Sequence, residues 1–313
     1  MNSQRLRGII PPIVTPLDDD GHVDAAALTQ LTEHLISSGV HGIFVLSSTG
    51  EVAYLDDTER MRAIDTVAQA AGGRVPVLAG VIDLTCARVA TQAKLAAACG
   101  ASAVVTTAPL YALNDTAEIE DHFRRIAEAS TVPVYAYDVP VRVRTKLSIE
   151  SLIRLALEGV ICGIKDSSGD DVGFRRLILA NKEAGSPLQV FTGHEVLVDT
   201  MIHLGADGAV PGLANVDVAG YRRLWDATQA KDWDQARLEQ ARLATLFEIT
   251  SQIDGRSPDA SGVGSFKIAM RLQRLIPSAR MSAPVQETTD VEVLTRIAKL
   301  LRHADLDCGG LIP

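Results

Sequence analysis

Cysteine is scarce in this sequence, and the way it is scattered excludes several classes of protein. The 313 residues contain four cysteines, and no two of them form a CxxC pair. Isolated thiols of this kind are typical of a reduced intracellular protein, and they predict neither a disulfide framework nor a structural zinc site. Residues 1–8 lack the continuous apolar core of a secretory signal, so we expect a cytoplasmic protein.

A positive net charge and a long apolar run are also missing. Lysine and arginine total 30 against 39 acidic residues, which gives a formal net charge of -9. This acidic balance argues against nucleic acid as a partner. The longest stretch without a charged residue, 95–114, is interrupted by glycine, serine, threonine and proline. We interpret it as the end of a helix followed by a strand, and we expect no membrane span.

Sequence motifs for nucleotides and metals are absent as well. No GxxxxGK occurs, and no GxGxxG opens a predicted helix, so a nucleotide-binding loop is poorly supported. None of the seven histidines forms an HxH or HExxH arrangement. The sequence therefore gives no indication of a metal site, although ligands can lie far apart in a sequence.

What the sequence does contain is one repeated unit: a helical segment, then glycine, then a short apolar run. The runs lack polar alternation, which indicates strands buried on both faces, and glycine provides the left-handed residue that ends a helix. The predicted strands lie in 9–15, 43–45, 75–81, 101–105, 132–137, 160–164, 188–192 and 209–210. The predicted helices are 24–37, 57–70, 85–98, 117–129, 149–157, 172–183, 195–203 and 216–230.

This alternation favours a (β/α)8 TIM barrel, because parallel strands require crossover helices. A doubly wound open sheet is the main alternative, since periodicity alone does not distinguish a closed sheet from an open one. Residues 231–313 contain no strand candidate and predict three helices, around 233–252, 264–275 and 290–304. We therefore expect a catalytic barrel over residues 1–230 and a C-terminal helical domain over residues 231–313.

In such a barrel the chemistry lies where strands end on the C-terminal face, so the residues after each apolar run are the candidates. After the second run, Ser48, Thr49 and Gly50 leave backbone N–H groups that can hold a carboxylate, although a plain capping loop is an equally good interpretation. After the fifth run, Tyr137 can pass a proton and Arg142 can grip a carboxylate. A packed aromatic and a solvated arginine would give the same pattern.

A lysine ends the sixth run, which is otherwise apolar. Lys165 follows Gly163 and Ile164 and precedes Asp166, at the point where a barrel strand opens into the mouth. Partial desolvation there disfavours the ammonium form, so the neutral amine becomes available to attack a carbonyl and form a Schiff base. A salt-bridged or solvated lysine is the default at an arbitrary strand end, and only the neighbouring candidates favour catalysis.

Together these segments resemble the dihydrodipicolinate synthase and N-acetylneuraminate lyase superfamily, the pyruvate-dependent class I aldolases. The similarity runs from Ile9–Leu17 to Gly264–Met270 and keeps Ser48, Tyr137 and Lys165 in register. The resemblance implies a (β/α)8 barrel with a helical C-terminal domain. It also implies that a covalent imine with the substrate takes the place of any metal or cofactor.

The resemblance implies a role for each candidate residue. Lys165 would be the Schiff-base lysine, with Tyr137 and Ser48 in a proton relay. Tyr111 would enter that relay from a neighbouring subunit, which requires a homo-oligomer, typically a dimer of dimers. Lys267 matches a family motif in the helical domain, and we expect its role to be structural. The substrate contacts would be Thr49, Arg142, Gly50 and Gly193.

Departures from the family pattern leave the second substrate open. Asp138 stands where most members have asparagine, and Arg144 is a second arginine whose role the resemblance does not explain. Arg142 and Tyr111 favour a dihydrodipicolinate-synthase-like reaction of pyruvate with aspartate semialdehyde. The altered loops at Arg144 and Gly212 favour instead a 2-keto-3-deoxy sugar acid or N-acetylneuraminate aldolase or dehydratase. A binding protein that keeps the 2-keto acid site without turnover is a further alternative.

Overall fold

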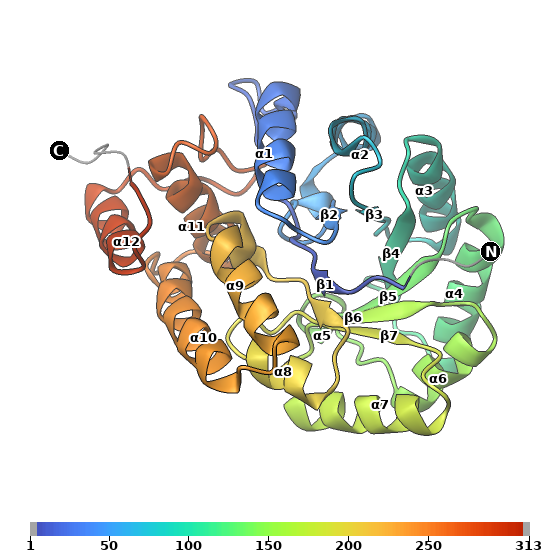
Figure 1. Cartoon of the computed structure of the whole chain (residues 1–313). Helices are drawn as coiled ribbons and strands as arrows, with labels where there is room; N and C mark the ends of the chain where they lie inside the picture. The colour runs from blue at the N-terminus through green and yellow to red at the C-terminus, as the bar shows by residue number, and fades with distance from the viewer. Residues whose placement is uncertain (1–4, 309–313) are drawn as a thin grey trace.

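The computed structural model describes residues 5–308, and its centre is a sheet of eight parallel strands (Figure 1). The strands are Gly8–Ile9 (β1), Ile43–Val45 (β2), Val77–Gly80 (β3), Ala103–Thr107 (β4), Val134–Asp138 (β5), Gly163–Asp166 (β6), Gln189–Thr192 (β7) and Gly208–Ala209 (β8). Hydrogen-bonded neighbours follow the order β1-β8-β7-β6-β5-β4-β3-β2. Each apolar run predicted from the sequence overlaps one of these strands.

Main-chain hydrogen bonds also join the two ends of this strand order. Phe44 of β2 donates its N–H to the carbonyl of Pro11 at 2.9 Å, and Ile13 donates to the carbonyl of Phe44 at 3.0 Å. Pro12 and Phe44 form a parallel bridge, so the segment after β1 lies beside β2. The sheet therefore curls until its edges meet, as in a (β/α)8 barrel, whereas an open doubly wound sheet would keep those edges apart.

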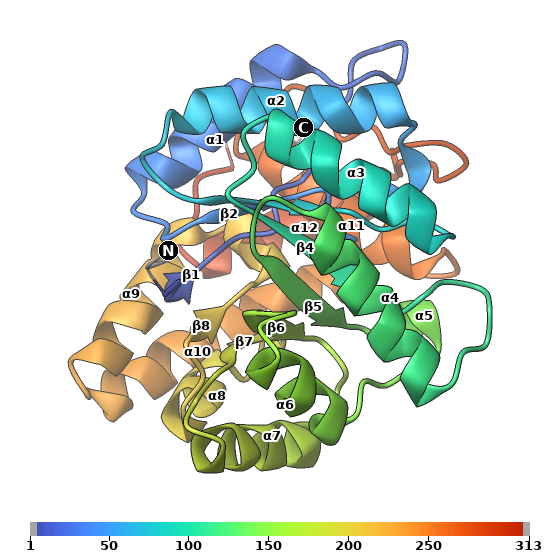
Figure 2. The same cartoon turned by 90° about the vertical axis from the view of Figure 1, so that its right-hand side faces the viewer.

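Helices follow the strands and cover the outside of the curled sheet (Figure 2). They are Ala25–Ser37 (α1), Asp57–Ala71 (α2), Cys86–Ala98 (α3), Thr116–Ala129 (α4), Pro140–Val143 (α5), Ile149–Leu157 (α6), Asp171–Glu183 (α7), Val198–Leu204 (α8) and Val218–Gln229 (α9), with short 3₁₀ helices Val52–Tyr54 (η1) and Gly212–Asn215 (η2). Side chains such as Asp24 and Asp56 cap the first free N–H groups. The short α5 was not predicted, and α8 begins three residues later than expected, which leaves Glu195 in a loop.

The described chain after α9 contains helices joined by loops, and it contains no strand. It forms Trp233–Phe247 (α10), Glu248–Ser251 (η3), Pro258–Leu272 (α11) and Val291–His303 (α12). α11 begins earlier than predicted because Ser257 caps it and Pro258 occupies its first turn. α10 packs on α8 and α9 (Figure 1). α11 contacts η2. The boundary between two domains at residue 230 stays a prediction, and residues 1–4 and 309–313 of the predicted ranges lie outside the described part.

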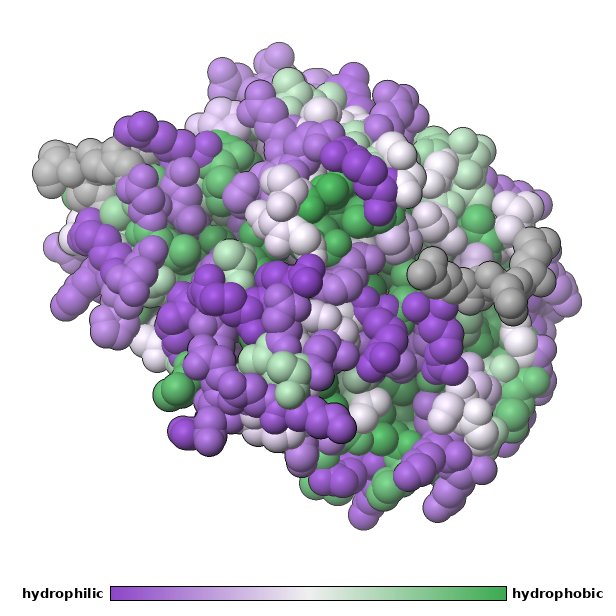
Figure 3. Space-filling view, viewed as in Figure 1, coloured by the Kyte–Doolittle hydropathy of each residue, from purple (hydrophilic) through white to green (hydrophobic). Residues whose placement is uncertain are grey.

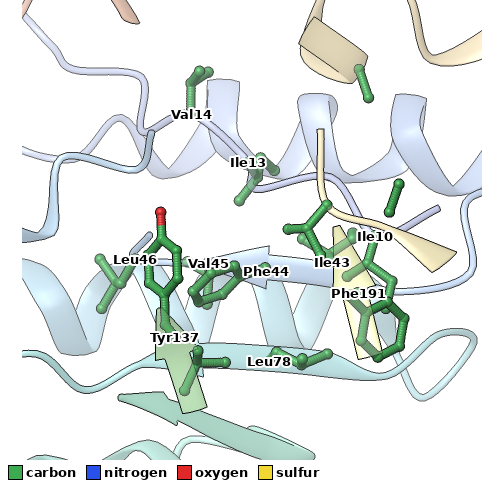
Figure 4. Packing of buried hydrophobic residues seen from close by; sticks show 14 of the residues in the cluster. Ile10, Ile13, Val14, Ile43, Phe44, Val45, Leu46, Leu78, Tyr137 and Phe191 are labelled. Atoms are coloured by element: carbon green, nitrogen blue, oxygen red, sulfur yellow. The ribbon is translucent and has the colours of Figure 1, made fainter. Parts of the chain in front are cut away.

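Apolar side chains fill the barrel below its mouth (Figure 4). Ile10, Phe44, Leu78 and Phe191 are buried there and, with Lys165, border a void of only about 10 Å³. The floor beneath the lysine is therefore packed and dry. On the outside, hydrophilic side chains dominate the face in Figure 3, with smaller apolar areas between them. No helix within residues 5–308 is long and apolar enough to cross a bilayer.

Candidate active site

Lys165 lies on β6 with its amine enclosed by aromatic rings. The residue is 7% exposed, and its neighbours in register are Tyr137 on β5 and Phe191 on β7. Its Nζ lies 4.5 Å from the ring centroid of Tyr137 and 5.4 Å from that of Phe44. The structure thus brings the predicted amine and the predicted phenol together inside the barrel mouth.

Gly193 follows β7 and lies against the lysine side chain. A Cβ atom at this position would lie 1.9 Å from Ser167 Oγ and 3.2 Å from Lys165 Cε. The Gly193 N–H donates to the Asp166 carbonyl at 2.7 Å, which fixes the loop against β6. A side chain at 193 would therefore displace the Ser167 hydroxyl and crowd the lysine, and glycine leaves this space open.

The proton affinity of Tyr137 is set by its neighbours. Its ring packs edge-on against Phe44, with centroids 6.3 Å apart, and its hydroxyl points away from Leu78 (Figure 4). Burial alone raises the pKa of this phenol, but the positive charge of Lys165 and hydrogen bonds with Ser48, Ser167 and the lysine outweigh burial and bring the pKa below its ordinary value. The phenol therefore releases its proton more readily than an isolated tyrosine, which suits proton transfer.

The loop after β2 carries the predicted residues Ser48, Thr49 and Gly50. Ser48 and Thr49 are half-buried, and Ser48 faces Tyr137 through the hydrogen bond just described. Gly50 donates its N–H to Ser47 Oγ at 3.2 Å, and its carbonyl accepts from Thr15 Oγ1 at 2.8 Å. Both backbone groups of Gly50 are thus engaged in shaping the turn that presents Ser48 and Thr49.

A buried ion pair anchors the end of this loop to α11. The Glu51 carboxylate lies 2.9 Å from Lys267 Nζ and accepts hydrogen bonds from the Ser282 N–H at 3.1 Å and hydroxyl at 2.7 Å. Lys267 is fully buried and also donates to the Arg280 carbonyl at 2.8 Å. Burial lowers the pKa of Lys267, although Glu51 opposes this shift. The position of Lys267 fits a structural role, because it ties α11 to the loop that bears Ser48.

A cavity of about 770 Å³ opens beside Ser48 at the mouth of the barrel. Ser48, Tyr111 and Arg142 from the predicted set line it, together with Asp259 from α11. A cavity of this size is typical of small-molecule sites. Neither Lys165 nor Tyr137 lines this cavity, but Tyr137 is connected to it through its hydrogen bond with Ser48.

Arg142, the predicted carboxylate ligand, already has a carboxylate partner. On α5, its two terminal nitrogens donate to the two oxygens of Asp259, one of them at 3.0 Å. Tyr54 of η1 donates its hydroxyl to Asp259 Oδ2 at 2.6 Å. Burial raises the pKa of Asp259, but Arg142 and Tyr54 outweigh it and hold the pKa below its usual range. Sequence analysis missed Asp259 and Tyr54, because neither follows a predicted strand.

Comparison with known proteins decides the family. A model described as the Dihydrodipicolinate synthetase family matches residues 5–303. The chain belongs to this family. A 4-hydroxy-tetrahydrodipicolinate synthase of Kineococcus radiotolerans is 30% identical over 305 residues, which cover 97% of this chain and 94% of that protein. An uncharacterized DapA-like lyase of Halobacterium salinarum is 35% identical over 259 residues, or 82% of each chain.

Solved structures of the dihydrodipicolinate synthetase family share the fold. YagE, a prophage protein of Escherichia coli K12 solved in complex with pyruvate, superposes with a TM-score of 0.91 at 26% identity, covering 97% of this chain and 100% of that one. Dihydrodipicolinate synthase from Bacteroides thetaiotaomicron gives 0.90 at 30% identity, covering 96% and 99%. The predicted family is therefore confirmed, and a lyase is supported, while the second substrate stays open.

Two predicted residues of this family member lie at the outer rim of the cavity. Tyr111, between β4 and α4, has a positive φ of 66° and is 97% exposed. The single chain therefore does not bring Tyr111 to Tyr137. Arg144 ends α5 with a φ of 59° and is also exposed.

Asp138, which replaces the usual family asparagine, is fully buried and engaged. Its carboxylate forms an ion pair with Lys146 and accepts the Leu147 N–H at 3.1 Å. Burial raises the pKa of Asp138, and Lys146 opposes the shift without cancelling it. Lys146 also lies 3.6 Å from Asp166. This network holds the segment after α5 against β5 and β6, the two strands that carry Tyr137 and Lys165.

Glu195 is a titratable residue that sequence analysis missed, since it was assigned to a helix. It lies in the loop after β7 and accepts the Leu213 N–H at 2.6 Å. Burial raises the pKa of Glu195 to about 7, against the opposing effect of hydrogen bonds from Leu213 and Gly212 and of the charge on Lys165. The loop at Gly212, which departs from the family pattern, therefore serves to hold this carboxyl group. Within residues 5–308, no cluster of three or more His, Cys, Asp or Glu side chains could hold a metal ion.

Proposed function

We propose that this protein is a class I lyase that binds pyruvate, or a 2-keto acid that yields pyruvate, as an imine on Lys165. The observation that supports it is the buried amine of Lys165 with its Nζ 4.5 Å from the ring centroid of Tyr137, whose pKa is lowered. The amine adds to the keto carbon and water leaves, which gives an iminium. Loss of a methyl proton then gives an enamine, whose carbon forms or breaks the bond to the second substrate.

The proposed roles follow from position. Tyr137 moves protons to and from the imine nitrogen and the reacting oxygen, and Ser48 relays them. Thr49 and the backbone of the same loop hold the pyruvate carboxylate. Gly193 leaves space for the lysine, and Gly50 shapes the turn. The imine takes the place of a cofactor, so we expect no dependence on added metal.

Two observations bear on the second substrate. Several relatives named 4-hydroxy-tetrahydrodipicolinate synthase favour aspartate semialdehyde. Arg142 matches the arginine with which synthases of this family bind the carboxylate of that acceptor, but here Arg142 is paired with Asp259. The alternatives to aspartate semialdehyde are a 2-keto-3-deoxy sugar acid or N-acetylneuraminate as substrate, or binding of a 2-keto acid without turnover. Steady-state kcat/KM on aspartate semialdehyde, 2-keto-3-deoxygluconate and N-acetylneuraminate, with product formation as the criterion, separates all three.

We also propose a homo-oligomer, a dimer of dimers, in which Tyr111 completes the relay of a neighbouring copy. Its side chain is 97% exposed, as a residue that inserts into a partner would be in one chain. A monomeric dihydrodipicolinate synthase variant with the same fold is known, so the fold itself does not require assembly. Location in the cytoplasm stays a prediction.

The proposed function is tested by the fate of the pyruvate methyl protons. In deuterated water the wild-type protein should exchange these protons for deuterium without any aldehyde, and NMR follows the loss of the methyl signal. Lys165→Met should abolish exchange, since no imine forms. Wild-type protein that leaves the methyl signal intact would contradict the proposal.

A further inference from the structure

The ion pair between Arg142 and Asp259 dominates the polar wall of the cavity. Both terminal nitrogens of the guanidinium are bound to the carboxylate, and Tyr54 donates a third hydrogen bond at 2.6 Å. Asp259 is 7% exposed. Bidentate arginine–carboxylate pairs of this kind are among the stronger charge-assisted contacts in proteins. The Arg142 side chain is 39% exposed, but Asp259 neutralises its positive charge, so an incoming carboxylate would meet an ion pair rather than a free cation.

The other charged groups of the cavity give a substrate carboxylate little to bind. Glu51 is buried against Lys267 and Ser282 and is itself negative. Arg144 lies at the rim, where its exposed guanidinium is solvated and screened. Arg142 and Arg144 are the two cations among the described lining residues, and Asp259 neutralises the charge of Arg142.

Three of the hydroxyl groups on the cavity wall already have hydrogen-bond partners. Thr107 donates to the Ala108 carbonyl at 2.8 Å, Tyr54 donates to Asp259, and Ser48 is hydrogen-bonded with Tyr137. A polyhydroxylated acceptor would therefore find fewer free hydroxyl donors on this wall, which weakens its binding. The rest of the inner wall is apolar, with side chains such as Ile82, Leu110, Val139 and Val143.

We infer that Asp259 determines specificity by masking Arg142, so that the second substrate is an uncharged aldehyde with an apolar alkyl or aryl substituent. This inference rests on the proposed function. The enamine carbon bonds to the aldehyde carbon, and the aldehyde oxygen takes up a proton. Water then hydrolyses the iminium to free Lys165, so that pyruvate and RCHO together give RCH(OH)CH₂COCO₂⁻.

Three four-carbon aldehydes test the inference at matched length. Butanal is uncharged and apolar, succinic semialdehyde carries a terminal carboxylate, and erythrose carries hydroxyls. With pyruvate and the wild-type protein, kcat/KM for butanal should exceed that for each of the others by about tenfold or more. Preference for succinic semialdehyde or erythrose would overturn the inference, and so would the absence of product from butanal.

Variants of the ion pair test the role assigned to Asp259. Asp259→Asn should free Arg142 and raise kcat/KM for succinic semialdehyde by roughly tenfold. Adding Arg142→Gln to that variant should remove the gain, because the freed guanidinium is its cause. Asp234→Asn, at a side chain that is 94% exposed, is the matched control and should change nothing. An unchanged preference in Asp259→Asn would overturn the inference.

Exchange of the pyruvate methyl protons separates failure of this inference from failure of the proposed function. The control Asp234→Asn should exchange these protons at the wild-type rate. The variants of the ion pair should still exchange them measurably, which shows that the site is folded and forms the enamine. Intact exchange with the wrong aldehyde preference overturns the role of Asp259 alone. Absence of exchange in the wild-type protein overturns the proposed function and this inference with it.

Discussion

At the scale of single residues, the chemistry depends on how Tyr137 exchanges its proton. Its pKa lies below the ordinary value of 10.0, chiefly because Lys165 and Ser48 offset the effect of burial. When the rate of proton exchange is plotted against pH, the inflection that reports ionisation of Tyr137 should therefore lie below pH 10. Tyr137→Phe should remove this inflection and slow exchange by about a hundredfold or more.

Ser48→Ala is the companion variant for this prediction. Without the serine hydroxyl, Tyr137 loses a hydrogen bond that lowers its pKa. The inflection of the pH–rate profile that reports Tyr137 should therefore move to higher pH without disappearing. An inflection at the same pH in wild type and Ser48→Ala would mean that the serine does not act on the phenol. Circular dichroism shows whether either variant is folded.

Glu195 makes folding stability depend on pH. Its pKa is about 7 in the folded protein against an ordinary 4.5, so the folded state holds the proton more tightly than the unfolded state. This stabilisation is complete below pH 4.5 and is lost as the pH rises through 7. Urea midpoints of Glu195→Gln should therefore exceed those of wild type at pH 8 and approach them near pH 5. A difference in urea midpoint between the two proteins that stays constant from pH 5 to pH 8 would contradict the raised pKa of Glu195.

Sequence analysis at this scale identified residues that follow apolar runs, and it missed residues that do not. Lys165 and Tyr137 end strands, so their proximity follows from the geometry of neighbouring barrel strands. Asp259 lies 117 positions from Arg142, and no local pattern connects the two. The arginine could be predicted, but the pairing that changes its role required the three-dimensional structure.

At the scale of elements, α11 and the loop after β2 are joined by the ion pair of Glu51 and Lys267. Lys267→Met should destabilise the protein by about 3–5 kcal/mol, because the buried Glu51 carboxylate loses its partner. Adding Glu51→Gln should recover part of this loss, and urea unfolding measures both. Arg74→Met, which breaks an exposed pair with Glu33, is the control and should cost less than about 1 kcal/mol. Equal costs in the two single variants would contradict the structural role of Lys267.

The order and type of elements could be predicted because apolar runs and helical spacing alternate regularly along the chain. The ends of elements do not follow from periodicity where a side-chain contact or a very short helix is involved. α8 begins at Val198, and the carboxyl of Glu195 ahead of it accepts the Leu213 N–H of η2, a contact that spacing alone does not reveal. The four residues of α5 are too few to leave a periodic pattern.

At the scale of the whole molecule, the exposed Tyr111 predicts catalysis across subunits. Tyr111→Phe should lower kcat by about tenfold or more, and Lys165→Met should be inactive. When these two proteins are mixed and reassembled, activity should partly return, because a mixed pair combines an intact Lys165 with a partner's intact Tyr111. Sedimentation should show a species larger than the 33.4 kDa chain. A fully active monomer, or a mixture without recovery, would contradict this arrangement.

Closure of the barrel could be predicted only as one of two alternatives. It depends on hydrogen bonds between Phe44 and the segment 11–13, which come from opposite ends of the strand order. Periodicity describes each strand separately and carries no information about which edges meet.

The central claim is that Lys165 captures a 2-keto acid covalently. Borohydride reduces an imine to a stable amine, so the direct measurement is incubation with pyruvate and borohydride followed by peptide mass spectrometry. The account predicts a reduced pyruvyl group on Lys165 in the wild-type protein and an unmodified chain in Lys165→Met. An unlabelled Lys165, or a label on another lysine, would contradict the account.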